Sequence, residues 1–255
     1  MGVLKDRVVA VTGGAGGIAR GIAEAVLEQG GRVGLMDLDR TKIEAAAGAL
    51  DAGDRVMGLV ADVTDPASTE AALADLKARM GRLDGLVNNA GVVRLGPAME
   101  TTAAGLDLEL AVNVKGVFLT SQAAARLFTD GGSIVNVASN AGKVGYPNMA
   151  GYNASKAAVI NLTRSLALEW ADKGINVNAV CPGGVATDML KSVADFLAPR
   201  LAQEKEALYG TMHPAQLGRH IQPIEVGRVI AFLLSDAAVI IRGQAINIDG
   251  GDTPY

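Results

Sequence analysis

The sequence lacks the residues that would indicate three specialised kinds of protein. A single cysteine, Cys181, excludes an internal disulfide, and we expect a reducing, cytoplasmic setting. The only histidines, His213 and His220, do not have the spacing of zinc ligands, so we expect no metal site. No run of about 18 apolar residues occurs, and the first residues do not have the pattern of a signal peptide. We therefore expect neither a membrane span nor export.

An excess of charge of one sign is also lacking. The chain has 23 Lys and Arg residues against 27 Asp and Glu, a net charge of −4. It has no basic footprint for nucleic acid and no polybasic segment for an anionic membrane. Apolar residues make up 49% of the chain and 32 residues are glycine, which allows a large core and tight turns. These features predict a soluble protein whose partner is a small molecule.

Short runs rich in Val, Ile and Leu alternate with longer stretches of helical periodicity. This alternation predicts βαβ units around a parallel sheet, whose right-handed crossovers place helices on both faces. The predicted fold class is α/β, a three-layer doubly wound parallel sheet of Rossmann type with about seven strands, forming one domain over residues 1–255. The expected strands are Arg7–Thr12, Arg32–Asp37, Arg55–Ala61, Asp84–Asn88, Ser133–Ser139, Asn176–Cys181 and Gln244–Ile248. The expected helices cover residues 18–29, 41–50, 67–80, 101–128, 152–172 and 223–235.

Residues 187–222 break this alternation. They carry Met, Leu, Phe and Tyr side chains among charges, followed by Pro and Gly residues. We expect a helical excursion that closes over the substrate as a lid, not a second domain.

The segment VVAVTGGAGGIARGIAEAV has the pattern of a strand, a glycine turn and an amphipathic helix. Glycines permit a tight turn and close backbone approach, and the free N–H groups at the start of the helix attract an anion. The segment satisfies two dinucleotide fingerprints, Gly14-x-Gly16-x-x-Ala19 and Thr12-Gly13-x-x-x-Gly17-x-Ala19. The alternative is a glycine turn with a purely structural role.

Asp37 ends the second expected strand, after the glycine turn. A carboxylate at this place accepts hydrogen bonds from a ribose hydroxyl and repels a 2′-phosphate. Because the glycine turn contains no Lys or Arg, NAD is favoured over NADP as the cofactor. Two alternatives stay open: Asp37 merely caps a turn, or Arg40 nearby accommodates the phosphate of NADP.

Motifs along the whole chain resemble those of the short-chain dehydrogenase/reductase family in the form that has this chain length. In order, they are Thr12-Gly13-x-x-x-Gly17-x-Ala19, Asp62, Asn88-Asn89-Ala90-Gly91, Asn113, Ser139, Tyr152-x-x-x-Lys156 and Pro182-Gly183. Ala19 departs from the third glycine usual in the family, but alanine is small enough for the same contact between helix and strand.

The resemblance implies where the cofactor would bind. Asp62 and Val63 would line the adenine pocket, and Thr187 would reach the nicotinamide carboxamide. For Asn89, the alternative role is a turn that ties neighbouring strands, and the family allows both roles at once. The implied cofactor residues are Gly13, Gly17, Ile18, Asp37, Asp62, Val63, Asn89, Ala90, Gly91, Tyr152, Lys156, Pro182, Gly183, Val185 and Thr187.

Tyr152 and Lys156 lie four positions apart in a helix-patterned segment, so both project from one face. Carbonyl reduction needs an acid and alcohol oxidation needs its conjugate base, but a free tyrosine has a pKa near ~10. An ammonium about 4 Å away contributes around 4 kcal/mol at an effective dielectric of roughly 20, so we expect Lys156 to lower the pKa of Tyr152. Ser139 could orient the substrate oxygen. In the family, the asparagine matching Asn113 interrupts helical bonding, and its main-chain carbonyl holds a water that relays protons.

Each of these residues also has an ordinary structural interpretation. Tyr-x-x-x-Lys pairs occur on helix surfaces, a serine often ends a strand as a turn former, and an asparagine in a helix is often solvated. Their occurrence together and in order favours the catalytic interpretation. A serine hydrolase fits poorly, because no G-x-S-x-G elbow surrounds Ser139.

These features predict an NAD-dependent oxidoreductase that interconverts a secondary alcohol and a ketone by hydride transfer. The alternatives are a 3-oxoacyl thioester reductase, a polyol or sugar dehydrogenase, and a dinucleotide-sensing scaffold without activity. Asp37 argues against the first, and the presence of Tyr152 and Lys156 argues against the last. The apolar content of residues 187–222 favours secondary alcohols, cyclic alcohols or acyl-type ketones over highly hydroxylated sugars; the alternative is that these residues pack the lid against the body. The resemblance also implies a homotetramer.

The same resemblance outlines a substrate pocket. Arg94 or Lys143 could recognise a carboxylate on the substrate, and His213 could contact the substrate. For each of these residues, the alternative is a solvated side chain. The implied pocket residues are Val93, Arg94, Asn140, Ala141, Gly145, Tyr146, Asn148, Met149 and Gly184.

Overall fold

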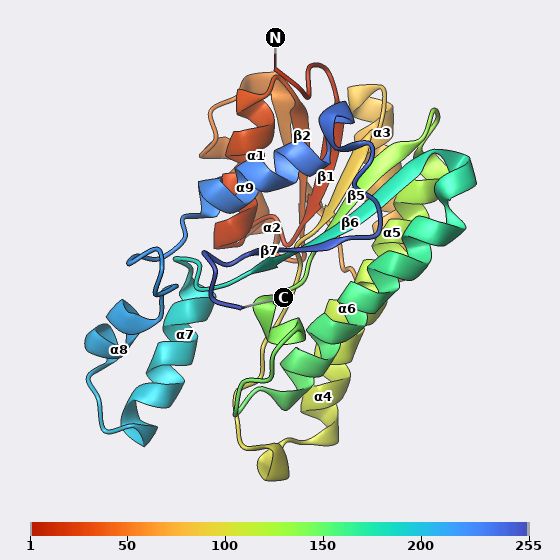
Figure 1. The fold of residues 1–255 in the computed structure, drawn as a ribbon. Helices are drawn as coiled ribbons and strands as arrows, with labels where there is room; N and C mark the ends of the chain where they lie inside the picture. Colours follow the sequence, from red (N-terminus) through yellow and green to blue (C-terminus); the bar gives the residue numbers. More distant parts are fainter. Residues whose placement is uncertain (1, 254–255) are drawn as a thin grey trace.

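A computed structural model describes residues 2–253 and contains a single seven-stranded sheet in which all pairings are parallel. The strand order is β3-β2-β1-β4-β5-β6-β7, so the direction of winding reverses between β1 and β4 (Figure 1). The expected doubly wound sheet is therefore confirmed. The strands are β1 (Val8–Thr12), β2 (Arg32–Asp37), β3 (Val56–Val60), β4 (Gly85–Asn88), β5 (Gly132–Val137), β6 (Ile175–Pro182) and β7 (Ala245–Ile248).

Helices cover both faces of the sheet because the central strands are apolar on both sides. Helices α1 (Gly17–Glu28), α2 (Arg40–Gly48) and α9 (Pro223–Leu233) contribute to one buried cluster, which includes Ile22 and Ile230. Helices α3 (Pro66–Met80), α5 (Val117–Leu127) and α6 (Ala150–Glu169) contribute to a second, which includes Leu76. The sheet is thus the middle layer of three, as expected (Figure 1).

Two glycines let α1 and α9 approach each other at backbone distance. A Cβ atom built on Gly21 would lie 2.2 Å from the carbonyl carbon of Pro223. A Cβ atom on Gly227 would lie 2.1 Å from the carbonyl oxygen of Gly21. Because these neighbours are backbone atoms, no side-chain rotation could make room for an added methyl group.

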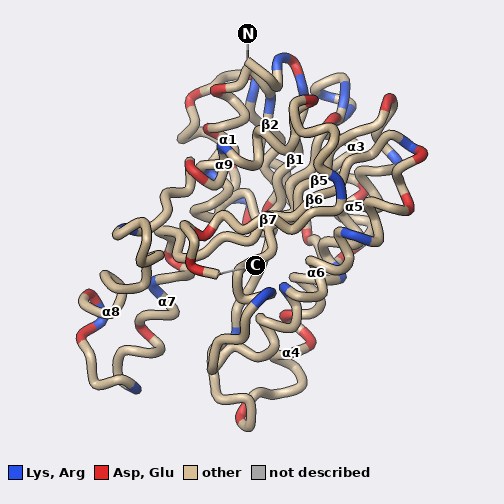
Figure 2. The backbone as a smooth tube through the Cα atoms, viewed as in Figure 1, with Lys and Arg blue, Asp and Glu red and all other residues tan. Residues whose placement is uncertain are grey.

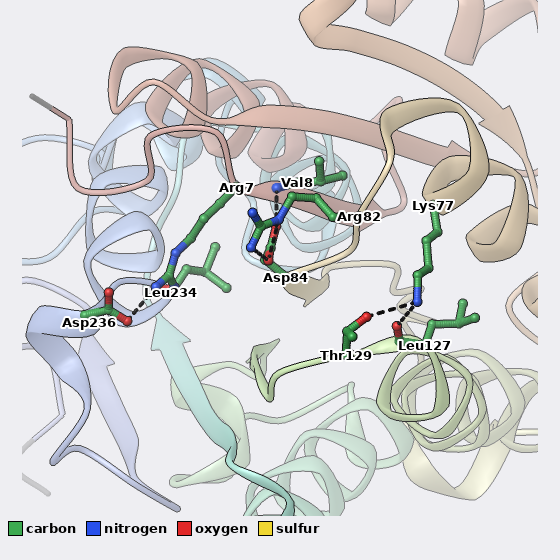
Figure 3. Close-up of polar contacts among 9 residues, drawn as sticks. All are labelled: Arg7, Val8, Lys77, Arg82, Asp84, Leu127, Thr129, Leu234 and Asp236. Carbon is green, nitrogen blue, oxygen red and sulfur yellow. Dashed lines mark hydrogen bonds and ion pairs between the residues drawn. The ribbon is translucent and has the colours of Figure 1, made fainter.

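Polar contacts tie the loops together where the strands begin (Figure 3). Asp84 accepts a hydrogen bond from the backbone N–H of Val8 at 2.8 Å and pairs with Arg82 at 2.6 Å. Lys77 on α3 donates to the carbonyl oxygen of Leu127 at 2.7 Å. These contacts stabilise the amino ends of the strands, and the opposite edge of the sheet, formed by their carboxyl ends, carries the candidate site.

The expected helix over residues 101–128 is divided into three parts. Helix α4 (Ala103–Leu110) leads into a π-helical stretch (Ala111–Gly116), and α5 follows directly. The wider turn of a π-helix disturbs the regular i to i−4 hydrogen bonds, and such turns often lie at functional sites. Asn113 is in this stretch.

Residues 187–222 form two helices, α7 (Asp188–Leu197) and α8 (Lys205–Thr211), that project from one side of the sheet (Figure 1). A small apolar cluster holds them together, with Ala194, Ala198 and Leu208 buried at its centre. An isolated parallel bridge between Val185 and Ile221 closes the base of the segment. The expected helical excursion is therefore present.

Lys and Arg residues are interspersed with Asp and Glu residues along the described backbone (Figure 2). Within residues 2–253, no helix has the length and apolar character needed to span a membrane.

Candidate active site

A cavity of about 420 Å³ lies at the carboxyl ends of the central strands. In a doubly wound sheet this is the edge at which ligands bind, next to the point where the winding reverses. The cavity brings together many residues that lie far apart in the sequence. Those expected for the cofactor or the reaction are Ile18, Asn89, Gly91, Ser139, Tyr152, Lys156, Pro182, Gly183, Val185 and Thr187. Those expected for the substrate are Val93, Asn140, Ala141, Tyr146, Met149 and Gly184.

The glycine turn between β1 and α1 packs directly against the end of β4. Gly13 has a φ of 62°, and a Cβ atom there would lie 2.8 Å from the Cα atom of Ala90. Thr12 accepts hydrogen bonds from the backbone N–H groups of Asn89 and Ala90, at 3.0 and 3.1 Å. The Asn89 side chain donates back to the carbonyl oxygens of Thr12 and Gly13. Asn89 thus ties the two strand ends together and also borders the cavity, so both of its expected roles are compatible with the structure.

The first turn of α1 is open to a ligand. Its N-cap residue, Gly16, provides no side-chain cap, so backbone N–H groups at this end stay available to an anion. A Cβ atom on Gly17 would lie 3.2 Å from the Cγ2 atom of Thr187, which places the start of α7 beside the glycine turn. This arrangement fits the pyrophosphate of a dinucleotide at the glycine turn.

Asp37 lies at the carboxyl end of β2 and faces the same turn. Its carboxylate accepts a hydrogen bond from the backbone N–H of Ala15 at 3.0 Å. Arg40, the residue that would have to accept a 2′-phosphate, instead lies 3.5 Å from Glu44 on its own helix. A carboxylate, and not a cation, is therefore hydrogen-bonded to the glycine turn at this end of the site.

Asp62 and Val63 follow β3 and do not line the cavity itself. The Asp62 carboxylate accepts hydrogen bonds from the backbone N–H and the hydroxyl of Thr64, at 2.8 and 2.7 Å. Val63 packs against the π-helical stretch, where a Cβ atom on Gly116 would lie 2.9 Å from it. Their expected place beside the adenine stays a prediction.

Tyr152 and Lys156 project from one face of α6 into the cavity, as their spacing predicts. The Lys156 ammonium is buried, donates to the carbonyl oxygen of Val137 at 2.8 Å, and lies 5.6 Å from the centre of the Tyr152 ring. Ser139 also faces the cavity, although the strand that was expected to reach it ends at Val137. The tyrosine, the lysine and the serine are thus assembled around one space.

The pKa of Tyr152 does not follow the expected direction. Burial raises the pKa of the phenol to about 12, while a hydrogen bond with Ser139 opposes the rise and the charge of Glu109 adds to it. Burial lowers the pKa of Lys156 to about 8. Our expectation considered the charge of Lys156 and left out desolvation, which is the largest cause of the rise in the pKa of Tyr152.

Asn113 connects the π-helical stretch to α6. Its side chain accepts a hydrogen bond from the backbone N–H of Val92 at 2.8 Å and donates to the hydroxyl of Ser155 at 2.9 Å. A Cβ atom on Gly91 would lie 3.4 Å from Asn113 and 3.5 Å from the Lys156 ammonium. Gly91 therefore leaves the space between these two side chains open.

Two acidic residues of the site were missed by the sequence reasoning. Glu109 is 1% exposed, accepts a hydrogen bond from the backbone N–H of Arg94, and its pKa is raised by burial. Gly151, which precedes Tyr152, leaves room for the Glu109 carboxylate, because a Cβ atom there would lie 2.2 Å from it. Asp252, near the C-terminus, lines the cavity. The pair Gly250-Gly251 marked a turn at this place, but nothing in the sequence indicated where the turn would lie.

Comparisons with known proteins agree with this architecture. A family model described as Enoyl-(Acyl carrier protein) reductase matches residues 13–253. The chain is 42% identical over 253 residues to 2-(S)-hydroxypropyl-CoM dehydrogenase 3 of Xanthobacter autotrophicus, with 98% of each chain covered. It is 39% identical over 254 residues to D-threitol dehydrogenase of Mycolicibacterium smegmatis, covering 98% of this chain and 94% of the relative.

Two solved structures are similar over nearly the whole chain. Levodione reductase aligns with a TM-score of 0.91 and 34% identity, covering 97% of this chain and 98% of that protein. A variant of actinorhodin polyketide ketoreductase, determined with NADPH, aligns with a TM-score of 0.92 and 34% identity, covering 99% and 100%. The fold of this chain is therefore shared with named reductases.

Proposed function

Because this chain belongs to the short-chain dehydrogenase/reductase family, we propose that it is an NAD-dependent oxidoreductase that interconverts a secondary alcohol and a ketone, with Tyr152 as the acid/base. One observation carries the proposal. Tyr152, Lys156 and Ser139 line the same cavity as Asn89 and Gly91, which adjoin the glycine turn. A reacting carbon in this cavity would have a proton donor on one side and the dinucleotide site on the other.

The residues of the chain have distinct tasks in such a reaction. Bound NAD⁺ supplies the hydride acceptor. Tyr152 removes the hydroxyl proton during oxidation and returns it during reduction. Ser139 holds the substrate oxygen near the phenol. Below its pKa of about 8 the Lys156 ammonium carries a positive charge beside Tyr152 and favours the phenolate. Asn113 fixes the position of the first turns of α6 through Ser155.

Asp37 supports NAD as the cofactor. Its carboxylate is held against the glycine turn, where it would accept hydrogen bonds from ribose hydroxyls and repel a 2′-phosphate. NADPH stays the alternative, since one structural neighbour was determined with it. The remaining cofactor contacts proposed from the family motifs are Gly13, Gly17, Ile18, Asp62, Val63, Ala90, Pro182, Gly183, Val185 and Thr187.

Three further features complete the proposal. Exposed apolar side chains on α4 and α5, among them Leu106, Leu110 and Phe118, support a homo-oligomer, for which we propose a tetramer. The lone, buried Cys181 is compatible with a cytoplasmic location. Residues 187–222 contribute Met189, Leu190, Val193, Thr211, Met212 and His213 to the cavity wall, as a substrate lid would.

The test is turnover by Tyr152→Phe. We expect the variant to lose at least about a hundredfold in kcat, the usual contribution of a positioned acid/base, and to bind NADH with nearly unchanged affinity in a fluorescence titration. The assay follows NAD⁺ reduction over a set of secondary alcohols, diols and hydroxy acids, with acyl thioester ketones assayed in the reverse direction. Activity of Tyr152→Phe equal to that of the wild type would remove Tyr152 from the mechanism. A wild-type protein that binds NADH and turns over none of these compounds would support the scaffold alternative.

A further inference from the structure

We propose that Asn140, Tyr146 and Asp252 form a hydroxyl-binding subsite, and that the substrate is a diol whose second hydroxyl is held there. This inference rests on the proposed function, because it places the first hydroxyl at Tyr152. The three residues, called the polar trio below, line the same cavity as Ser139 and Tyr152.

Asn140 connects the polar trio to the reacting end of the cavity. It is 7% exposed and directly follows Ser139 in the chain. Its side-chain amide donates a hydrogen bond to the Tyr146 hydroxyl at 3.0 Å and another to the Asp252 carboxylate at 3.4 Å. A substrate that reaches from Tyr152 past Ser139 therefore meets Tyr146 and Asp252 next.

The polar trio offers what a hydroxyl group requires. The Tyr146 hydroxyl accepts from Asn140, so its own hydrogen is available to a ligand. Burial and the charges of Asp252 and Asp249 raise the pKa of Tyr146, which keeps this donor protonated. The Asp252 carboxylate can only accept. A substrate hydroxyl can accept from Tyr146 and donate to Asp252 at once, whereas an ammonium would satisfy the acceptor alone.

The charges around the cavity disfavour an anionic substrate. Among residues 2–253, Asp252 is the one carboxylate in the cavity wall, and Lys156 is the one Lys or Arg residue. Lys156 is engaged with Val137. Arg94 and Lys143, which we considered for carboxylate recognition, do not line the cavity. Lys143 donates instead to the carbonyl oxygen of Ala245. A carboxylate bound at the polar trio would thus meet the like charge of Asp252, while the Lys156 ammonium lies beside Tyr152.

Asp252 is held in place by a built turn. The buried Asp249 carboxylate accepts from the backbone N–H groups of Gly251 and Thr253, at 3.1 and 2.9 Å. Gly250 and Gly251 have φ values of 66° and 83°, which side-chain-bearing residues rarely adopt. Gln216 donates to the carbonyl oxygen of Gly251 at 2.9 Å. Contacts from both the sheet and the 187–222 segment therefore fix the direction of the turn.

The apolar part of the cavity completes the substrate class. Apart from the polar trio, this part of the cavity wall is formed by apolar side chains, which are Met149, Met189, Leu190, Val193 and Met212. The ligand that fits is an uncharged diol with an apolar remainder, not a highly hydroxylated sugar.

The experiment compares kcat/KM for matched pairs, 2,3-butanediol against 2-butanol and 2,4-pentanediol against 2-pentanol. We expect at least one diol to exceed its monoalcohol by about tenfold or more, the effect of a hydrogen bond to a charged but solvent-accessible group. In Asp252→Ala and Tyr146→Phe this ratio should fall toward one. Asp172→Asn, which removes an exposed carboxylate at the opposite end of the sheet, should keep the wild-type ratio. Melting temperature and NADH affinity, measured for every variant, show that each is folded.

The other outcomes separate two failures. Oxidation of monoalcohols and diols with equal efficiency, or a ratio unchanged in Asp252→Ala, overturns the subsite and leaves the proposed function standing. A preference for 3-amino-2-butanol over the diol, or for 3-hydroxybutyrate, overturns the assignment to a hydroxyl. No oxidation of any of these compounds with either dinucleotide overturns the proposed function itself.

Discussion

The choice of cofactor is the prediction that the structure allows us to work out furthest. Asp37 is half-buried at the end of β2, with its carboxylate 3.0 Å from the backbone N–H of Ala15. At about 5 Å and an effective dielectric of about 40, two like unit charges repel by about 1.7 kcal/mol. A phosphate monoester carries about 1.5 to 2 charges near neutral pH, so the repulsion is about 3 kcal/mol. We expect NADH to bind about a hundredfold more tightly than NADPH.

Two substitutions separate the charge of Asp37 from its hydrogen bond. Asp37→Asn keeps an oxygen that can accept from Ala15 and removes the charge, whereas Asp37→Ala removes both. We expect Asp37→Asn to bring the NADPH dissociation constant down by about ten- to a hundredfold while weakening NADH by less than about tenfold. In Asp37→Ala the difference in affinity between NADH and NADPH should also become smaller. The loss of NADH affinity should be larger than in Asp37→Asn, because the backbone N–H of Ala15 loses its hydrogen-bond acceptor.

The assay is a fluorescence titration with each reduced dinucleotide, checked by calorimetry, so that no substrate is needed. Asp54→Asn, an exposed carboxylate before β3 at the amino end of the sheet, is the matched control and should change neither constant. The preference should also weaken as the salt concentration rises, since salt screens repulsion between partly exposed charges. Equal affinities of the wild-type protein for NADH and NADPH, or an unchanged ratio in Asp37→Asn, would refute the reasoning.

Two further predictions concern stability. Gly227→Ala should lower the melting temperature by at least about 5 °C, because its methyl group would clash with the backbone of Gly21. Gly48→Ala is the control and should not lower it, because a Cβ atom on Gly48 has nothing within 4 Å. Equal melting temperatures for the two variants would contradict the backbone contact. The hydrogen bond with Arg219 lowers the pKa of Glu225 to about 2. The wild type should therefore be more stable than Glu225→Gln above pH 4.5, and this difference in the free energy of unfolding should disappear as the pH falls toward 2. Chemical unfolding across this range measures the difference, and a constant difference would show that the pair does not contribute.

The fold was predictable because its pattern is local. Buried parallel strands read as short apolar runs, and the helices between them show their own period. The glycine turn was predictable for the same reason. Gly13 has a positive φ, which glycine adopts readily, and the strand and helix patterns on either side of it indicate a tight turn. The pairing of Tyr152 with Lys156 follows from helix geometry alone. The division of the helix around Asn113 was expected only through the family resemblance, because a π-helical turn has no sequence signal of its own.

The direction of the Tyr152 pKa was not predictable in this way. Charge attraction between neighbours on a helix can be read from spacing, but the cost of desolvation depends on every side chain that covers the phenol. Glu109, whose charge adds to the rise in the pKa of Tyr152, comes from another helix, and Gly151 leaves room for its carboxylate.

Sequence by itself determined the strands, the glycine turn, the acidic residue at the end of β2 and the helical pair Tyr152 and Lys156, because each depends on residues a few positions apart. Tertiary structure alone decided that Asp252 joins Asn140 in the cavity wall. Asn140 and Asp252 are 112 positions apart and meet because β7 pairs with β6, which pairs with β5, so that their carboxyl ends lie side by side. Separation along the chain carries no information about such a contact, and strand order in the sheet supplies it.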